Sequence, residues 1–235
     1  MAGAQSRDEL QAAVLAANLA LPEHRLVTLT WGNVSGLDRE SGTMAIKASG
    51  VDYKSMTAQD MVLIDLESGE PLVDDGRRPS TDTPTHLALY RAAPQLGGIV
   101  HTHSPWATAW AQAGRAIPVL GTTHADHSGE PVPVTRQLTP DEVAEDYEGA
   151  TGTVLIETVD GRFGEIPAAL VRGHGPFAWG ASPEAAVKAA VTLESLAQMA
   201  LLTVALNPEA GPLARYVVDK HYERKHGPGA YYGQG

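Results

Sequence analysis

The pattern of apolar and polar residues predicts helices at four places along the chain. Apolar side chains recur at helical spacing over residues 7–20, and Pro22 is expected to end that helix. Three further helices are marked by their start signals, a capping residue with a proline and an acid beside it. These signals are the segments Ser80–Pro84, Thr139–Glu142 and Ser182–Glu184, and the last opens a long apolar helix over residues 183–207.

Short apolar runs between glycine, proline and acidic turns predict the strands. The segments with this pattern are residues 26–31, 43–48, 61–66, 97–103, 151–158 and 167–175. The first three follow one another with no helical pattern between them, which favours an antiparallel meander over strict βαβ alternation. We therefore expect a mixed α/β fold of the α+β type, with residues 1–235 forming a single domain.

Charge and cysteine content restrict the chemistry. The formal net charge of −11 disfavours nucleic acid and anionic membranes as partners, although a local basic pocket can still hold one phosphate. Because there is no cysteine, any metal ion must be held by histidines and carboxylates. The chain starts without a leader pattern, and no apolar run approaches about 18 residues, so we expect a cytoplasmic protein.

Histidines at the ends of apolar runs suggest a metal site. Side chains two residues apart in a strand point to the same side, so His101 and His103 could bind one ion or simply form local hydrogen bonds. His174 also follows an apolar run, and three imidazoles suit zinc or a similar divalent ion. Asp82 or His86 could add a carboxylate or support a ligand, while Asp82 could equally cap its helix. The spacing does not match a dioxygenase facial triad.

Two glycine-containing turns could bind a phosphate group. Residues 29–36 and 46–53 combine glycine with small hydroxyl or amide side chains, and the second segment adds Lys47. Exposed backbone N–H groups beside a lysine can hold a phosphate, and Ser80 and Thr81 at a helix start could contribute more donors. Neither segment matches a Walker loop or a dinucleotide fingerprint, so ordinary turns and helix caps remain the alternative.

Seven motifs together resemble the L-ribulose-5-phosphate 4-epimerase family of the class II aldolases. In chain order they are LVTLTWGNVSG, IKASGVDY, STDTPTH, GGIVHTHS, GTTHADH, HGPFAWG and the tail DKHYERKHGPGAYYGQ. The resemblance as a whole extends from about residue 8 to the C-terminus. The resemblance implies a mostly antiparallel sheet of about nine strands flanked by helices. It also implies a four-fold homotetramer with active sites between neighbouring subunits.

The activity that this resemblance implies is epimerisation at C4 of L-ribulose 5-phosphate, giving D-xylulose 5-phosphate. Because C4 carries no acidic proton, the implied route is retro-aldol cleavage of C3–C4 to the enediolate of dihydroxyacetone phosphate and glycolaldehyde. The aldehyde then rotates and adds back through its other face. One divalent cation per subunit, zinc first and manganese or cobalt as alternatives, would stabilise the charge on the C2 and C3 oxygens.

The motifs also carry the family's site residues to positions in this chain. The implied metal ligands are His101, His103 and His174, with Asp82 as a further ligand or near neighbour. The implied proton carriers are Asp126 and Tyr232, the latter within residues 220–235, a tail that reaches a neighbouring subunit's active site. The implied phosphate-binding residues are Asn33, Lys47, Ser49, Gly50, Ser80 and Thr81. The implied pocket lining is Thr122, Glu148, His221 and Arg224.

Departures from the family pattern leave the range of substrates open. Arg172 stands where relatives often have another histidine, residues 127–131 differ, and Thr81 replaces a usual serine. Arabinose catabolism is the usual setting, with ascorbate and other pentose routes as alternatives. A rival function is a class II sugar-phosphate aldolase such as L-fuculose-phosphate aldolase, whose relatives usually have glutamate where Asp82 stands. A rival of another class is a non-catalytic adducin-like structural domain, which the three retained histidines disfavour.

Overall fold

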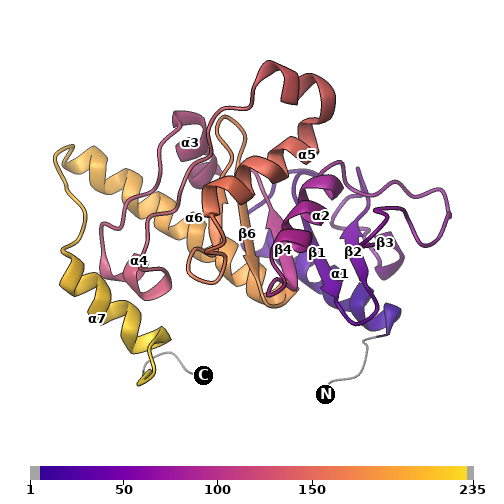
Figure 1. Ribbon diagram of the computed structural model, residues 1–235, viewed down its shortest axis with the longest axis horizontal. Helices are drawn as coiled ribbons and strands as arrows, with labels where there is room; N and C mark the ends of the chain where they lie inside the picture. Colours follow the sequence, from indigo (N-terminus) through magenta and orange to yellow (C-terminus); the bar gives the residue numbers. More distant parts are fainter. Residues whose placement is uncertain (1–5, 232–235) are drawn as a thin grey trace.

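Six antiparallel strands form the sheet at the centre of the protein (Figure 1). The structure is a computed structural model and describes residues 6–231. The strands are β1 (Asn33–Asp38), β2 (Thr43–Lys47), β3 (Met61–Asp65), β4 (Gly98–His101), β5 (Ala168–Leu170) and β6 (Pro176–Gly180). They lie in the order β3-β2-β1-β4-β6-β5, and every neighbouring pair is antiparallel.

The implied sheet of about nine strands is wrong for the residues described, which form a six-stranded sheet. Four further contacts of strand type occur only as isolated bridges, Ala48–Pro79, Ile64–Pro71, Ile117–Val132 and Val134–Leu170. Prolines stand in or directly beside each of these segments, and proline has no N–H with which to extend a ladder. The bridged segments therefore stay too short to count as strands.

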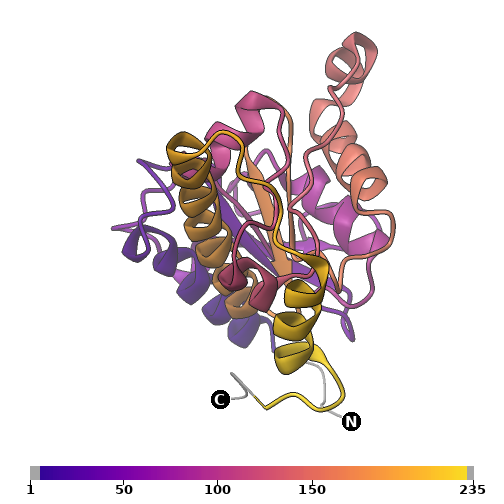
Figure 2. The same ribbon diagram turned by 90° about the vertical axis from the view of Figure 1, so that its left-hand side faces the viewer.

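Helices cover both faces of the sheet. They are α1 (Arg7–Glu23), α2 (Thr83–Ala92), α3 (Pro105–Ala113), α4 (Thr122–His127), α5 (Pro140–Val159), α6 (Pro183–Leu206) and α7 (Arg215–His226), with a short 3-10 helix at Ala58–Asp60. Alternate residues of each strand face opposite sides, so Ala45 packs toward α1, α3 and α6 while Met44 and Ile46 pack toward α2 and α5. Figure 2 shows the sheet between these two helix layers.

Helix α6 is long and apolar enough to cross a membrane by length and composition, the one such helix among residues 6–231. In the fold it packs along the sheet, where Leu193, Ala197 and Ala200 are buried in the same core as α1. The core helix of a folded domain passes the same composition test. The buried side chains of α6 therefore form part of this core, while Met199, Leu202 and Leu206 are exposed.

Helix start signals located the helices more reliably than apolar runs located the strands. The capping box of Thr139 and Glu142 is present at the start of α5, and Ser182 accepts a hydrogen bond from Ala185 N at 3.1 Å. Pro22 does not end α1, which continues to Glu23. The strand predictions over residues 43–48, 61–66 and 97–103 are confirmed by β2, β3 and β4.

Two strand predictions are wrong. Residues 26–31 form a turn in which Leu29 has a positive φ of 55°, and the strand begins only at Asn33. Residues 151–158 lie inside α5, where Val154 and Leu155 are buried, Leu155 in the core that α5 shares with α2. Their β-branched composition favours a strand, but packing of the helix on the sheet overrides that preference.

Candidate metal centre and active site

Three imidazoles meet at one end of the central strands. His101 ends β4, His103 follows it, and His174 lies in the turn between β5 and β6. The Nε2 atoms of His101 and His103 are 3.1 Å apart, and those of His103 and His174 are 3.2 Å apart. These three histidines form a group that could hold a metal ion. The predicted convergence of the imidazoles is therefore present, although β4 ends before His103.

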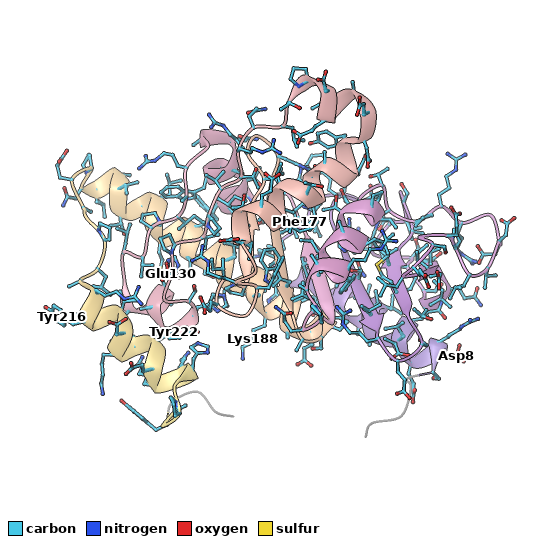
Figure 3. All side chains as sticks on the ribbon, viewed as in Figure 1. Asp8, Glu130, Phe177, Lys188, Tyr216 and Tyr222 are labelled. Carbon is cyan, nitrogen blue, oxygen red and sulfur yellow. The ribbon has the colours of Figure 1, made fainter. Side chains whose placement is uncertain are left out.

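Backbone packing brings His174 to the other two histidines. His101 stands opposite Phe177 in the β4–β6 ladder, and the two rings stack with their centroids 4.3 Å apart. Figure 3 labels Phe177 at the middle of the molecule. Gly175 fits the turn because an added Cβ would lie 2.8 Å from the carbonyl oxygen of Thr102. A larger residue at this position would push the His174 turn away from β4.

Hydrogen bonds of the imidazoles leave the converging nitrogens suited to bind a cation. His101 Nδ1 donates to the carbonyl oxygen of Pro176 at 3.0 Å, so a neutral His101 ring carries its lone pair on Nε2. Burial, followed by the charges of His101 and His103, lowers the pKa of His174 to about 4. Burial and the charge of His101 also lower the pKa of His103. His103 and His174 are thus neutral at pH 7.

Asp82 faces the same cavity and does not cap its helix. It occupies the N-cap position of α2 without a side-chain capping bond, and its Oδ2 accepts from Asn33 Nδ2 at 2.7 Å and Ser80 Oγ at 3.3 Å. Burial alone would raise the pKa of Asp82, but His101, His86 and the Asn33 hydrogen bond lower it overall. A charged carboxylate therefore lies beside three imidazoles.

A cavity of about 420 Å³ contains this group. Its lining residues are Trp31, Gly32, Thr81, Asp82, His101, His103, Tyr147, Glu148 and His174. Sequence reasoning missed Tyr147, whose hydroxyl lies 3.3 Å from His174 Nδ1. The helical path of α5 is interrupted at Asp146, whose carboxylate accepts from Gly149 N at 3.0 Å and so caps the segment that starts with Tyr147. That cap presents Tyr147 and Glu148 to the cavity.

Most residues implied in phosphate binding lie beside this cavity. Ser80 N donates to the carbonyl oxygen of Lys47 at 3.0 Å, and Ser49 N donates to that of Arg78 at 2.9 Å. Asn33 Nδ2 also reaches Ser80 Oγ at 3.0 Å. Gly50 has a φ of +74°, which continues the turn after Ser49. Thr81 lines the metal cavity itself. Hydrogen bonds thus connect Asn33, Lys47 and Ser80 to one another and to Asp82 of the cavity.

Lys47 is almost fully buried and turned toward backbone oxygens. Its Nζ lies 3.3 Å from the carbonyl oxygens of Thr30 and Ala48, and 5.3 Å from the centroid of the Tyr53 ring. Burial lowers the pKa of Lys47, while the charges of Asp52 and Asp60 oppose that shift. The ammonium group is thus held by neutral carbonyl oxygens, and the charges of Asp52 and Asp60 act on it.

A second group of implied residues lies elsewhere in the chain. Asp126 of α4 accepts hydrogen bonds from Arg224 Nε at 2.8 Å and from His221 Nδ1 at 3.0 Å, both on α7. Thr122 is exposed at the start of α4. None of these four lines the cavity with the histidines, and α4 and α7 lie together at one end of the molecule (Figure 1). Tyr232 lies outside the described residues, whereas the first part of the 220–235 tail is helical in α7.

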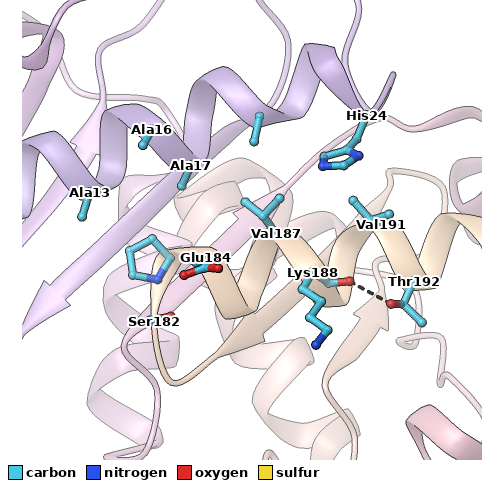
Figure 4. Close-up of a pocket in the computed structure, with 12 residues that line it drawn as sticks. Ala13, Ala16, Ala17, His24, Ser182, Glu184, Val187, Lys188, Val191 and Thr192 are labelled. Atoms are coloured by element: carbon cyan, nitrogen blue, oxygen red, sulfur yellow. Dashed lines mark hydrogen bonds between the residues drawn. The ribbon is translucent and has the colours of Figure 1, made fainter. Parts of the chain in front are cut away.

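A larger groove lies between α1 and α6 (Figure 4). It has a volume of about 560 Å³ and is lined largely by small apolar side chains such as Ala13, Ala17 and Val187. Within residues 6–231, the three histidines are the group able to hold a metal ion, and none of them faces this groove. The chemistry therefore favours the smaller cavity.

Comparison with known proteins assigns the chain to a family. A sequence profile described as "Class II Aldolase and Adducin N-terminal domain" matches residues 12–201, most of the chain. The chain belongs to the class II aldolase and adducin family. This family assignment confirms the predicted resemblance, and the fold is a class II aldolase-like α/β domain.

Curated relatives of this class II aldolase family member are epimerases by name. "L-ribulose-5-phosphate 4-epimerase UlaF" of Salmonella paratyphi C (strain RKS4594) is 52% identical over 231 residues, covering 96% of this chain and 99% of the relative. The protein of the same name from Salmonella typhi is 51% identical over 231 residues, with the same coverage.

Solved structures with this fold include aldolases. An L-fuculose 1-phosphate aldolase matches with a TM-score of 0.78 at 24% identity, covering 94% of this chain and 97% of the other. The L-fuculose-1-phosphate aldolase of Thermus thermophilus matches with a TM-score of 0.64 at 29% identity, covering 88% of this chain and 100% of the other.

Proposed function

We propose that this protein is a metal-dependent L-ribulose-5-phosphate 4-epimerase that forms D-xylulose 5-phosphate. The observation that carries the proposal is the meeting of three imidazoles and the Asp82 carboxylate in one cavity. That arrangement occurs in a chain 52% identical over nearly its whole length to a relative named as this epimerase. An adducin-like structural role would require none of these groups.

The donor set fits a divalent cation. We assign His101, His103 and His174 as ligands through Nε2, with Asp82 as a fourth ligand or near neighbour. Imidazole nitrogens with one carboxylate oxygen suit zinc, and manganese or cobalt are the alternatives. When bound, the cation would supply Lewis-acid stabilisation of negative charge on the substrate oxygens. The hydrogen bond from His101 Nδ1 to the Pro176 carbonyl oxygen holds the ring so that Nε2 faces the other two histidines.

The substrate's phosphate is assigned to the other side of the cavity. Lys47 supplies the charge, Ser80 and Thr81 supply hydroxyl groups, and Ser49 and Gly50 supply the turn. Asn33 connects the proposed phosphate side of the cavity to the proposed metal side, because its amide donates to both Ser80 and Asp82. The phosphate at one end and the reacting carbons at the histidines would orient the sugar along the cavity.

Proton transfer at the C4 oxygen is assigned to Asp126 and Tyr232. In this chain Asp126, His221 and Arg224 lie apart from the histidine cavity, which supports a site completed by a second copy of the chain. We therefore propose a homotetramer. In it, the 220–235 tail and α4 of one subunit lie against the histidine cavity of the neighbouring subunit. Thr122 and Glu148 are assigned to the walls of that shared pocket.

Product analysis separates the epimerase from an aldolase. Purified protein, stripped by chelator and reloaded with Zn²⁺, is incubated with L-ribulose 5-phosphate, and D-xylulose 5-phosphate and free glycolaldehyde are measured together. The proposal expects D-xylulose 5-phosphate with little glycolaldehyde. Glycolaldehyde and dihydroxyacetone phosphate as the main products would instead identify an aldolase. Loss of turnover in His103→Asn, with folding intact, would link the activity to the histidines.

A further inference from the structure

His86 of α2 is fully buried, and only one of its ring nitrogens is hydrogen-bonded. Its Nδ1 lies 2.7 Å from Ser35 Oγ, which lies 2.9 Å from the hydroxyl of Tyr90. Ser35 and Tyr90 are also fully buried. The Nε2 atom of His86 is buried and has no hydrogen-bond partner within residues 6–231. Buried polar nitrogens are nearly always hydrogen-bonded to protein or to an ordered water, so an Nε2 with no protein partner calls for an explanation.

The chain of hydroxyl groups controls which ring nitrogen of His86 carries the proton. Burial lowers the pKa of His86 to about 3 against the opposing charge of Asp82, so the ring is neutral at pH 7. If Tyr90 donates to Ser35 and Ser35 donates to Nδ1, the ring proton lies on Nε2. The negative charge of Asp82 favours this direction, because it attracts an N–H dipole and repels a lone pair.

The fold places His86 directly behind the proposed metal ligands. Asp82 and His86 are one helical turn apart, and His86 N donates to the Asp82 carbonyl oxygen at 3.1 Å, so their side chains lie on the same side of α2. The Phe177 ring stacks on His101 and also meets the His86 ring, with centroids 5.9 Å apart. Asn33 and Ser80 hold Oδ2 of Asp82, and neither of them holds Oδ1.

We propose that His86 is a positioning residue of the metal centre, which donates its Nε2–H to the Asp82 carboxylate through one buried water. The hydroxyl groups of Ser35 and Tyr90 keep the ring proton of His86 on Nε2. The Nε2–H group in turn orients the Asp82 carboxylate toward the three histidines. Groups that orient a metal ligand in this way commonly change metal affinity by about 10–100-fold when removed. The inference rests on the proposed function only in that the histidine cavity binds a metal.

The test is the dissociation constant of Zn²⁺, measured on the full chain by competition with a chromogenic chelator. His86→Asn keeps a polar group toward Ser35 but loses the distal donor, and we expect about 10-fold weaker binding or more. His86→Gln places an amide N–H near the former Nε2 and should recover part of that loss. His24→Asn, at an exposed histidine after α1, is the matched control and should bind as the wild type does.

A double-mutant cycle shows whether His86 acts through Asp82. In an Asp82→Asn background, His86→Asn should add little further loss, because the carboxylate that it orients is gone. If His86→Asn does not fold, Tyr90→Phe takes its place in the cycle with Asp82→Asn. That substitution removes only the Tyr90 hydroxyl, which contacts Ser35. Additive losses, or an unchanged dissociation constant in these His86 and Tyr90 variants, would overturn the positioning role. Wild-type protein that binds no divalent metal would overturn this inference and the metal centre together, whereas metal binding without epimerisation would overturn only the proposed function.

Discussion

Arg224 donates two hydrogen bonds to the carboxylate of Asp126, which lies 98 positions earlier in the chain. Burial alone would raise the pKa of Asp126, but the hydrogen bonds and charges of Arg224 and His221 lower it overall. Asp126 is thus ionised at pH 7. If Asp126 serves the C4 oxygen as proposed, it begins as the base that accepts a proton, and Tyr232 on the opposite face begins as the acid.

Replacing Arg224, the partner of Asp126, should change the pH dependence of turnover. In Arg224→Gln the pKa of Asp126 rises toward its ordinary value, so the base is protonated at a higher pH. We expect the acid limb of the kcat/KM profile to move to higher pH, with less change at the alkaline limb. The measurement is a pH series with L-ribulose 5-phosphate. Arg215→Gln, at an exposed arginine paired with Glu130 and Asp219, is the control, and equal profiles in both variants would contradict the assignment.

Asp126→Asn should separate proton transfer from metal binding. The substitution removes a proton acceptor without touching the three histidines, so we expect turnover to fall by about 10²-fold or more while one metal ion per subunit is retained. Metal content is measured by atomic emission on the same preparation used for kinetics. Wild-type turnover in this variant would remove Asp126 from the mechanism.

Mixing two inactive variants should restore activity if sites are shared between subunits. His101→Asn lacks a proposed metal ligand, and Tyr232→Phe lacks the proposed acid, so each homotetramer should be nearly inactive. In oligomers refolded from an equal mixture, about a quarter of the shared sites combine an intact metal half with an intact Tyr232. Activity that stays at the level of the separate variants would show that each chain carries a complete site.

Gly98 tests the packing that positions β4. A Cβ at this residue would lie 2.3 Å from the backbone oxygen of Ser182, at the start of α6. Because a backbone atom cannot move aside as a side chain can, Gly98→Ala should lower the free energy of unfolding by about 1–3 kcal/mol or more. Gly164→Ala is the matched control, since no atom lies within 4 Å of its added Cβ. Chemical denaturation measures both, and equal stability would contradict the packing described.

The meeting of the three histidines could be predicted because its signal is local. His101 and His103 end one apolar run and His174 follows another, so strand geometry alone predicts imidazoles at one end of a sheet. The partners of those imidazoles could not be predicted in the same way. The bond from His101 to the Pro176 carbonyl and the contact between His174 and Tyr147 depend on how distant segments pack.

The wrong strand predictions also arise from packing between distant segments, which the local pattern of residues does not show. Residues 151–158 have the composition of a strand, but they lie in the helical segment of α5 that Asp146 caps and that packs on α2. Residues 26–31 are apolar, yet they turn before β1 begins. Asp82 could be expected either to cap α2 or to face a metal, and only its bonds to Asn33 and Ser80 decide against the cap.

The proposed reaction inverts C4 of L-ribulose 5-phosphate by breaking and remaking the C3–C4 bond with the help of a metal ion. The most direct measurement is proton NMR of the Zn²⁺-loaded protein acting on L-ribulose 5-phosphate in D₂O. We predict D-xylulose 5-phosphate that retains its original hydrogen on C4, and no conversion after chelation until Zn²⁺ is restored. Deuterium at C4 of the product, or no D-xylulose 5-phosphate from metal-loaded protein, would contradict it.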